Sequence, residues 1–246
     1  MKKLCLALTL AAFAGIVSAK EAYRVKDLKD TSDHPLTVLE IAIADPLQLP
    51  PANWTVAGLR ANVFYAKSYK VMGLDLGLVG RCTDSFYGLS AQTVNWVEGD
   101  MAGILCGGLF NVVEGNATGI ELSVFANRTY DVFTGLQTAL VNYDGAFAGL
   151  QIGLVDWVRG VSGGAQIGAV NVSDNEFGGA QLGVVNYATR FRGVQLGVIN
   201  VIDETGSGVQ IGAFNAAPDF AGLQIGCMNY LGTGPLPLMP ILNASF

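Results

Sequence analysis

The chain has 246 residues, with 14 Lys and Arg against 20 Asp and Glu, and a formal net charge of −6 at neutral pH. So acidic a chain lacks the basic face that nucleic-acid binding requires, which excludes that class of partner. The mean hydropathy of +0.41 is high, yet beyond the N-terminus no run reaches the ~18 apolar residues of a membrane-spanning helix. The apolar residues and 32 glycines are dispersed along the chain, which favours a β-protein.

An export signal is predicted over residues 1–19. Lys2 and Lys3 supply the positive N-terminal region, residues 4–17 are apolar, and residues 17–19 (VSA) form a cleavage site of small residues. This order of regions is typical of secretory signals, and the apolar run is too short for a membrane anchor. We therefore expect an exported protein, at the cell surface or in the outer membrane of a bacterium.

The flanks of the mature chain differ from its centre. Residues 20–34 are polar, mixed in charge and predict a flexible leader. Residues 35–57 combine the β-like run TVLEIAIA with several prolines, and residues 235–246 carry prolines again. Proline cannot donate to a strand ladder, so it suits the blunted ends of a sheet. We interpret the first flank as a capping strand region and the second as an altered last repeat that caps the chain.

One eight-residue phrase, GxQxGxxN, organises residues 58–234. Its most regular copies are GLQIGLVD, GAQIGAVN, GAQLGVVN, GVQLGVIN, GVQIGAFN and GLQIGCMN, which follow one another at 14 or 15 residues. Less regular copies begin at Gly58, and two longer ones blur the pattern between Gly103 and Asn127. This gives an array of about twelve copies of 14–16 residues. A short fixed period is the signature of a repeat architecture.

Each copy predicts a β-strand. Leu150, Ile152 and Leu154 alternate with Gln151 and Gly153, a period of two residues that is typical of strands. Six or seven residues rich in turn-forming types follow each phrase and hold most of the charges. We call these the connecting segments.

Two polar columns recur at fixed positions of the phrase, and we interpret both as structural devices that set the stacking register. The third position, interrupted at Leu105, forms the Gln column: Arg60, Asp75, Ser90, Glu121, Gln137, Gln151, Gln166, Gln181, Gln195, Gln210 and Gln224. The last position forms the Asn column: Asn95, Asn111, Asn127, Asn142, Asp156, Asn171, Asn186, Asn200, Asn215 and Asn229. Where successive copies are neighbours, Arg60 and Asp75 are expected to form an ion pair on a polar face.

Two all-β architectures accommodate such a repeat. In a β-solenoid each copy is one coil, and the amide columns become hydrogen-bonded ladders along the stack. The alternative is a closed antiparallel barrel of the outer-membrane type, with apolar residues toward lipid and the Gln column in the lumen. Uniform connecting segments and the prolines at both ends favour the solenoid. The terminal Phe246 and the high hydropathy favour the barrel. Parallel or antiparallel pairing of neighbouring copies decides between them.

Side chains with catalytic or ligating potential are sparse. Beyond the signal there are three cysteines, Cys82, Cys106 and Cys227, without CxxC spacing, and the one histidine is His34 in the leader. Zinc sites need clustered Cys and His ligands, and nucleophilic catalysis by Ser or Cys needs a nearby base. We expect no metal, no cofactor and no enzymatic activity. Cys106 and Cys227 are interpreted as small apolar residues of the repeat strands.

Aromatic residues often follow the Asn column: Trp96, Tyr143, Trp157, Tyr187 and Tyr230. We interpret them as packing residues beside a turn. Aromatic rows on a repeat face also suit carbohydrate binding, which stays open as the alternative.

The repeats, entered through PLQLPP and GLRANVFY and closed by PLPLMPILNASF, resemble the bacterial surface-repeat family first named from leptospires. The resemblance covers about residues 45–246 and weakens at 103–127. It implies an exported surface or envelope protein and brings no catalytic residues. We expect a non-catalytic repeat protein with a structural or binding role. The alternative is an outer-membrane barrel that acts as a small pore. Outer-membrane association and a carbohydrate or protein ligand stay open.

Overall fold

The computed structural model describes residues 34–234 and 236–245. The predicted signal and all of the leader except His34 lie outside the described residues. The described chain is built of strands: β1 (Leu36–Ala44), β2 (Leu47–Leu49), β3 (Thr55–Asn62), β4 (Tyr65–Ser68), β5 (Lys70–Cys82), β6 (Phe86–Val97), β7 (Met101–Val113), β8 (Ala117–Ser123), β9 (Ala126–Thr138), β10 (Val141–Ile152), β11 (Val155–Val158), β12 (Ser162–Ile167), β13 (Val170–Leu182), β14 (Val185–Leu196), β15 (Ile199–Ile211), β16 (Phe214–Ala217), β17 (Asp219–Leu231) and β18 (Leu238–Ser245). No helix in this part of the chain is long and apolar enough to cross a membrane.

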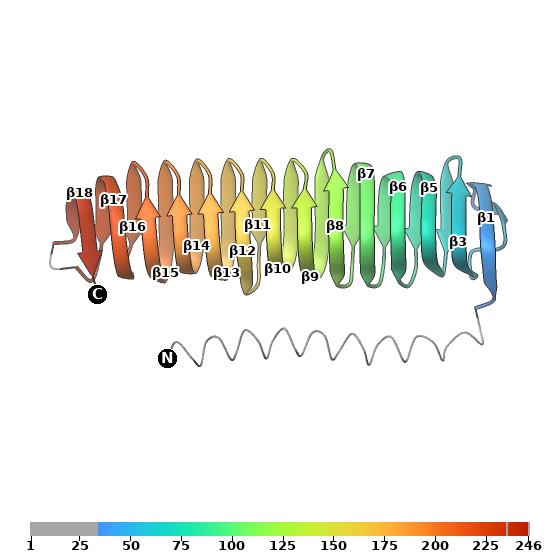
Figure 1. The fold of residues 1–246 in the computed structure, drawn as a ribbon, viewed down its shortest axis with the longest axis horizontal. Helices are drawn as coiled ribbons and strands as arrows, with labels where there is room; N and C mark the ends of the chain where they lie inside the picture. The colour runs from blue at the N-terminus through green and yellow to red at the C-terminus, as the bar shows by residue number, and fades with distance from the viewer. Residues whose placement is uncertain (1–33, 235, 246) are drawn as a thin grey trace.

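The strands form a β-solenoid of about 13 turns, so the favoured architecture is confirmed and the barrel is wrong. Neighbouring copies pair in parallel with like residues opposite each other, as Gln151 opposite Gln166 and Asn186 opposite Asn200 show. In Figure 1 the strands lie side by side along the long axis of a rod. With neighbouring strands ~4.8 Å apart, 13 turns give a rod roughly 60 Å long.

The bends follow the turn-forming residues only in the earlier coils: residues 83–85, 98–100 and 114–116 separate β5, β6, β7 and β8, as predicted, whereas in most later coils the bends lie elsewhere. The chain bends inside the phrase, at its fifth and sixth positions, so that Gly153 and Leu154 separate β10 from β11. The connecting segments of these later coils are largely extended, and the strand register shifts within them, for example between Ser173 and Glu176. Their Gly, Asn and Asp residues therefore make bulges more than hairpin turns, which is how an extra residue is accommodated in a continuous strand.

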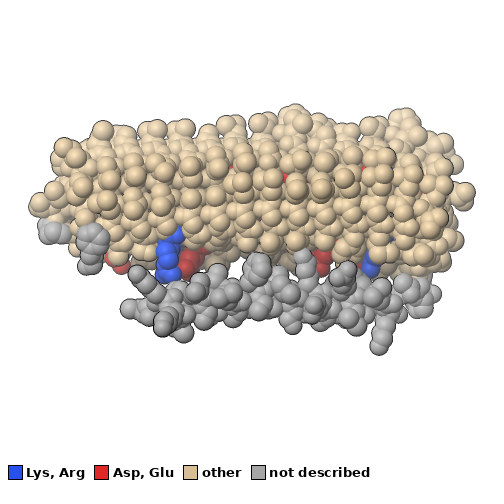
Figure 2. Space-filling view, in the orientation of Figure 1, with Lys and Arg blue, Asp and Glu red and all other residues tan. Residues whose placement is uncertain are grey.

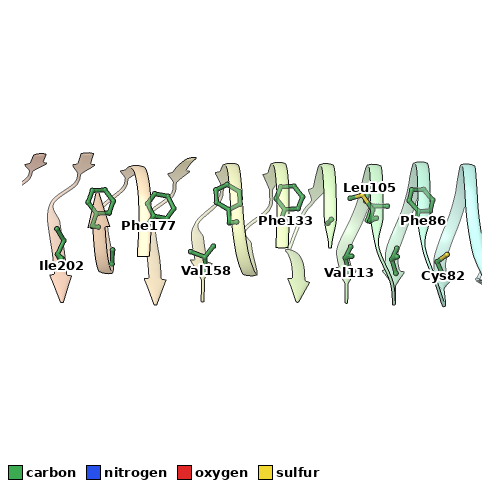
Figure 3. Packing of buried hydrophobic residues seen from close by; sticks show 14 of the residues in the cluster. Cys82, Phe86, Leu105, Val113, Phe133, Val158, Phe177 and Ile202 are labelled. Carbon is green, nitrogen blue, oxygen red and sulfur yellow. The ribbon is translucent and has the colours of Figure 1, made fainter. Parts of the chain in front are cut away.

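The coil interior holds two polar and two apolar columns. The Gln and Asn columns are buried beside the bend, so the Gln column is neither an external ladder nor the lining of a lumen. The other two columns lie two residues before the phrase glycine and two residues after the Asn column. In Figure 3 they form two rows along the rod, one with Phe86, Phe133 and Phe177 and one with Val158 and Ile202.

Stacked aromatic rings reinforce the apolar part of the core. Phe133 and Phe147 lie with ring centroids 6.2 Å apart and an interplanar angle of 4°. Phe177 and Phe191 repeat this arrangement at 6.0 Å and 4°. The members of each pair lie at the same position of adjacent coils, so the parallel stack itself brings identical rings face to face.

Both ends of the stack carry atypical strands. At the N-terminal end β1 pairs in parallel with β3 and antiparallel with β2, and His34 stacks on Tyr69 with ring centroids 3.4 Å apart. At the C-terminal end β18 runs antiparallel to β17. The segment that was predicted as an altered last copy thus differs from the other copies in direction, and it covers the edge of β17. Covered edges protect a sheet from pairing with other chains.

Candidate functional site

The Gln column is a continuous hydrogen-bonded ladder. From Gln151 to Gln224 each side-chain Nε2 donates to Oε1 of the glutamine one coil nearer the N-terminus, at 2.7–3.0 Å. All of these side chains are fully buried. A buried amide is tolerated when it both donates and accepts, and the parallel stack supplies both partners for each rung except the last, where Gln224 Oε1 has no hydrogen-bond partner among the described residues. The sequence-predicted role in stacking is in agreement with this geometry.

The Asn column is a second ladder of opposite direction. Each Nδ2 donates to Oδ1 of the asparagine one coil nearer the C-terminus, at 2.7–3.0 Å. The same amides also hold the bend of the next coil, as when Asn186 Nδ2 donates to the carbonyl of Leu196 at 2.9 Å. The opposed directions of the two ladders offset their dipoles within one core.

Asp156 interrupts the Asn ladder. Its Oδ1 accepts from Asn142 Nδ2 at 2.7 Å, but a carboxylate has no amide hydrogen to pass on to the next coil. Asp156 Oδ2 and Asn171 Oδ1 are buried acceptors without a hydrogen-bond partner among the described residues. Burial raises the pKa of Asp156 to about 6. The interpretation of Asp156 as a simple substitute for Asn thus overlooks the donor that it lacks.

The Gln ladder ends on a buried acidic pair. Gln137 Nε2 donates to Glu121 Oε2 and to Asp144 Oδ1, both at 3.0 Å, and Gln151 Nε2 donates to Asp144 Oδ2 at 2.7 Å. Burial raises the pKa of Glu121 to about 7. Burial and the nearby Glu121 raise the pKa of Asp144 well above its usual value. Asp144 precedes Gly145 in a connecting segment, where the sequence predicts a turn; the sequence signal was its place as the one charge in a column otherwise filled by apolar or small polar residues.

A charged network occupies the N-terminal coils. Arg60 donates from Nε to Asp75 Oδ1 at 2.8 Å and from Nη2 to Asp75 Oδ2 at 2.6 Å, and its Nη1 donates to Ser68 Oγ at 2.9 Å. Ser68 Oγ in turn donates to the carboxylate of Glu40. Burial raises the pKa of Glu40 to about 7. The ion pair is confirmed, but its expected position on a polar face is wrong. Both side chains are buried because the third position of the phrase points inward.

The three cysteines occupy different surroundings. Cys82 lies in the core, where burial raises the pKa of its thiol to about 12. Cys106 is half-buried and Cys227 is exposed, and all three are free. The described residues contain no group of His, Cys, Asp and Glu that could hold a metal ion. A surface hollow lies among connecting segments, lined by Glu176, Arg190, Phe191, Arg192, Thr205, Gly206 and Ser207.

The outer surface of the bends is apolar. The side chains at the second, fourth, sixth and seventh positions of the phrase point outward and form what we call the apolar edge. From Gly58 to Asn229 none of these positions holds a charged residue. Its exposed members include, at 45–56%, Leu78 within β5 and five bend residues: Val124, Leu140, Leu154, Val184 and Val198.

Exposed charges gather on the opposite side of the coils. The charged residues of the array that are not buried lie in the connecting segments or directly after the Asn column. In Figure 2 the blue and red atoms accordingly gather along one long side of the rod. They form mixed contacts, such as the exposed pair of Arg190 and Glu204 at 2.9 Å. The coil is thus amphipathic on its outside, with its polar ladders beneath the apolar edge.

Aromatic side chains stand between these two regions. Trp96 and Trp157, at 39% and 40% exposure, follow the Asn column and share the outer strand face with Tyr143. Trp96 Nε1 donates to Glu114 at 2.9 Å, and Trp157 Nε1 donates to Asp174 at 2.7 Å. We call this column, with Tyr187 and Tyr230, the aromatic row. Its indole rings border the apolar edge while their N–H groups point to the connecting segments.

No protein-family model, no curated protein and no solved structure matches the chain.

Proposed function

We propose that the chain is an exported, non-catalytic protein of the bacterial envelope, in which a rigid rod presents the apolar edge as its binding element. The observation that carries this proposal is the charge-free edge, which runs along the whole array. The predicted export signal and the resemblance to the leptospiral surface-repeat family support the location. The role is structural or adhesive, and the apolar edge is where the rod attaches.

The size of the apolar edge supports a binding role. A rod roughly 60 Å long with an edge about 10 Å wide presents on the order of 600 Å² of apolar surface. Contiguous apolar patches larger than a few hundred Å² usually mark interaction sites on soluble proteins. Covering such a surface contributes about 25 cal/mol per Å², and burial along the stack adds coil by coil.

The surroundings of the buried ionisable groups support a structural role for them in the interior of the coil. Glu121, Asp144 and Asp156 have raised pKa values, which often mark active sites. Here each accepts hydrogen bonds from ladder amides inside the coil, so the perturbation follows from the stacking. The pore alternative required the lumen of a barrel, whereas the axis of this solenoid is filled by amide and aromatic side chains.

Cell fractionation tests the proposal. The full chain, expressed with its signal in a bacterium with an outer membrane, should be recovered in the envelope fraction after a high-salt wash. The edge variant Leu78→Gln, Leu140→Gln, Val184→Gln removes three exposed apolar groups from non-adjacent coils and should shift most of the protein to the soluble periplasmic fraction. The control variant Tyr130→Gln, Val161→Gln changes exposed apolar residues of the connecting segments and should behave as the parent.

Two outcomes would contradict the proposal. Retention of the parent chain in the cytoplasm with its signal uncleaved would contradict export. An edge variant that folds, by its circular dichroism, and stays in the envelope like the control would contradict the role of the apolar edge.

A further inference from the structure

At several bends of the apolar edge, the backbone N–H groups donate hydrogen bonds to carbonyl groups of neighbouring coils. At the bend, the N–H of Gly153 donates to the carbonyl of Ile167 one coil away at 3.0 Å. The N–H groups of Leu154 and Val155 both donate to the carbonyl of Leu140 in the previous coil, at 2.9 and 3.0 Å. A backbone that enters hydrocarbon must satisfy its polar groups internally, because lipid offers no partners. The same set of N–H bonds recurs at the bends of Gly183–Val185 and Gly197–Ile199, so the parallel stack meets this condition for the N–H groups of these bends.

The aromatic row has the arrangement of an interfacial anchor. Trp and Tyr are enriched where apolar and aqueous regions of a membrane meet, because their rings are apolar and their N–H or O–H groups are polar. Here the rings of Trp96 and Trp157 border the apolar edge, and their Nε1 atoms donate to Glu114 and Asp174 on the charged side. The row therefore lies at the depth where the edge gives way to hydrated charges.

The shape of the apolar edge disfavours a second copy as its partner. In the copies that begin at Gly135, Gly149, Gly164, Gly179, Gly193 and Gly208, the sixth position of the phrase lies in the bend and the fourth or seventh positions lie at the adjoining strand ends, so the edge is a convex ridge there. Two convex ridges meet along a line and leave the flanking side chains uncovered. A fluid acyl layer instead conforms to the ridge and covers the second, fourth, sixth and seventh positions together.

The charges predict which term drives the contact. The connecting segments carry both signs, and basic residues such as Arg190 are paired with carboxylates such as Glu204. A polybasic segment gains about 1 kcal/mol of binding free energy per Lys or Arg near an anionic membrane. Since this chain is acidic, attraction to anionic lipids should contribute little to its binding. Binding by the apolar edge should therefore need neither anionic lipid nor low salt.

We propose that the partner of the apolar edge is the interfacial layer of a lipid bilayer, on which the rod lies lengthwise with the aromatic row at the headgroup level. This inference rests on the proposed function and names the partner of the same surface. Each coil contributes a similar increment of buried apolar area, so the affinity grows with the number of repeats.

Vesicle flotation with purified protein tests the lipid inference. Residues 20–246 are mixed with vesicles of phosphatidylcholine alone, and the bound fraction is measured at about 0.1 and 0.5 M salt. The higher concentration screens electrostatic attraction more strongly. The parent chain should float with the vesicles equally at both concentrations. The edge variant Leu78→Gln, Leu140→Gln, Val184→Gln should bind at least tenfold more weakly, and the control variant Tyr130→Gln, Val161→Gln should bind as the parent.

Fluorescence quenching by brominated phosphatidylcholine checks the orientation. The tryptophan emission of the parent should be quenched on binding, and Trp96→Phe with Trp157→Phe should remove most of that quenching while flotation persists. Unchanged quenching in this double variant would contradict the proposed depth of the aromatic row.

Failure of this inference is distinguishable from failure of the proposed function. If the parent does not float, but its edge variant is still released from the envelope of cells, the partner is a protein and the lipid inference is overturned alone. Edge-dependent dimers in sedimentation without flotation would identify a second copy. Flotation that requires anionic lipid, or is lost at the higher salt, would overturn the apolar mechanism.

Discussion

At the scale of single residues, the difference between an amide and a carboxylate decides where a hydrogen-bonded ladder of the core continues and where it ends. A glutamine or asparagine in a column donates to one neighbour and accepts from the other, so it extends a ladder indefinitely. A carboxylate accepts only, so Glu121 ends the Gln ladder and Asp156 interrupts the Asn ladder. Burial then raises the pKa of each of these groups, since desolvation disfavours the charged carboxylate.

Asp156→Asn should stabilise the protein in a pH-dependent way. The substitution supplies Asn171 Oδ1 with a donor and removes an unsatisfied buried acceptor, worth about 1–3 kcal/mol. The pKa of Asp156 is raised from 3.8 to about 6 in the fold, so its protonation favours the folded state. That contribution is full below pH 3.8 and is lost as the pH rises through about 6. The gain from the substitution should therefore be large at pH 8 and near zero at about pH 4.

Urea unfolding of the parent and variant at both pH values measures this difference. Asp203→Asn, an exposed change in a connecting segment, is the matched control and should leave the free energy of unfolding within about 0.5 kcal/mol of the parent. A stabilisation by Asp156→Asn of equal size at both pH values would show that protonation plays no part.

At the scale of the repeat element, the first glycine of the phrase permits the close approach of neighbouring coils. Gly179 has a φ of +141°, and a Cβ added to it would lie 2.0 Å from the carbonyl oxygen of Gly164. The same conformation and the same backbone contact recur at the other phrase glycines. A side chain at this position is disfavoured both by its own backbone conformation and by the coil before it.

Gly179→Ala should destabilise the rod, while its neighbour tolerates the same change. Backbone strain alone costs roughly 1–3 kcal/mol at such a position, and the contact with Gly164 adds to it. Gly178, in the same strand, has nothing within 4 Å of the position a Cβ would take, so Gly178→Ala is the matched control. Thermal unfolding monitored by circular dichroism compares the two variants. Equal melting temperatures for both would contradict the packing role of the phrase glycine.

At the scale of the whole molecule, the solenoid is a one-dimensional stack whose ends must be closed. Each coil contacts its neighbours alone, so stability builds from identical interfaces and the terminal coils need different strands. β18 pairs with residues 222–230 of β17 in the antiparallel direction and so occupies the edge on which a further coil would otherwise add. The cap thus covers the edge at which another chain could otherwise pair.

Deleting residues 235–246 should cause end-to-end association. The deletion exposes the backbone edge of β17, and open strand edges pair with other chains. Sedimentation velocity should show oligomers that grow with protein concentration. The full-length control Leu238→Gln, Leu242→Gln changes exposed side chains of β18 but keeps its backbone pairing, and should sediment as the parent. A deletion variant that sediments like the full chain would contradict the capping role.

The sequence by itself determined the repeat, its period and the columns, because a fixed phrase imposes equivalent surroundings on each copy. It also determined that Arg60 and Asp75 would be neighbours, since they share a column in successive copies. It could not determine which face of the strand is inside, because Gln151 and Leu154 alternate equally well in a solenoid and in a barrel. Nor could it place Asp144 in the core, because Asp-Gly is a common turn pair.

The tertiary structure decided those points through the direction of strand pairing. Parallel stacking aligns Gln151 with Gln137 and Gln166, so buried amides satisfy one another and the interior beneath the bends can be polar. Leu154 and its equivalents are left outside because the narrow bend has no room for them between the ladders. Composition fixed how many apolar residues the protein has, whereas hydrogen bonding between coils decided that a continuous row of them faces outward.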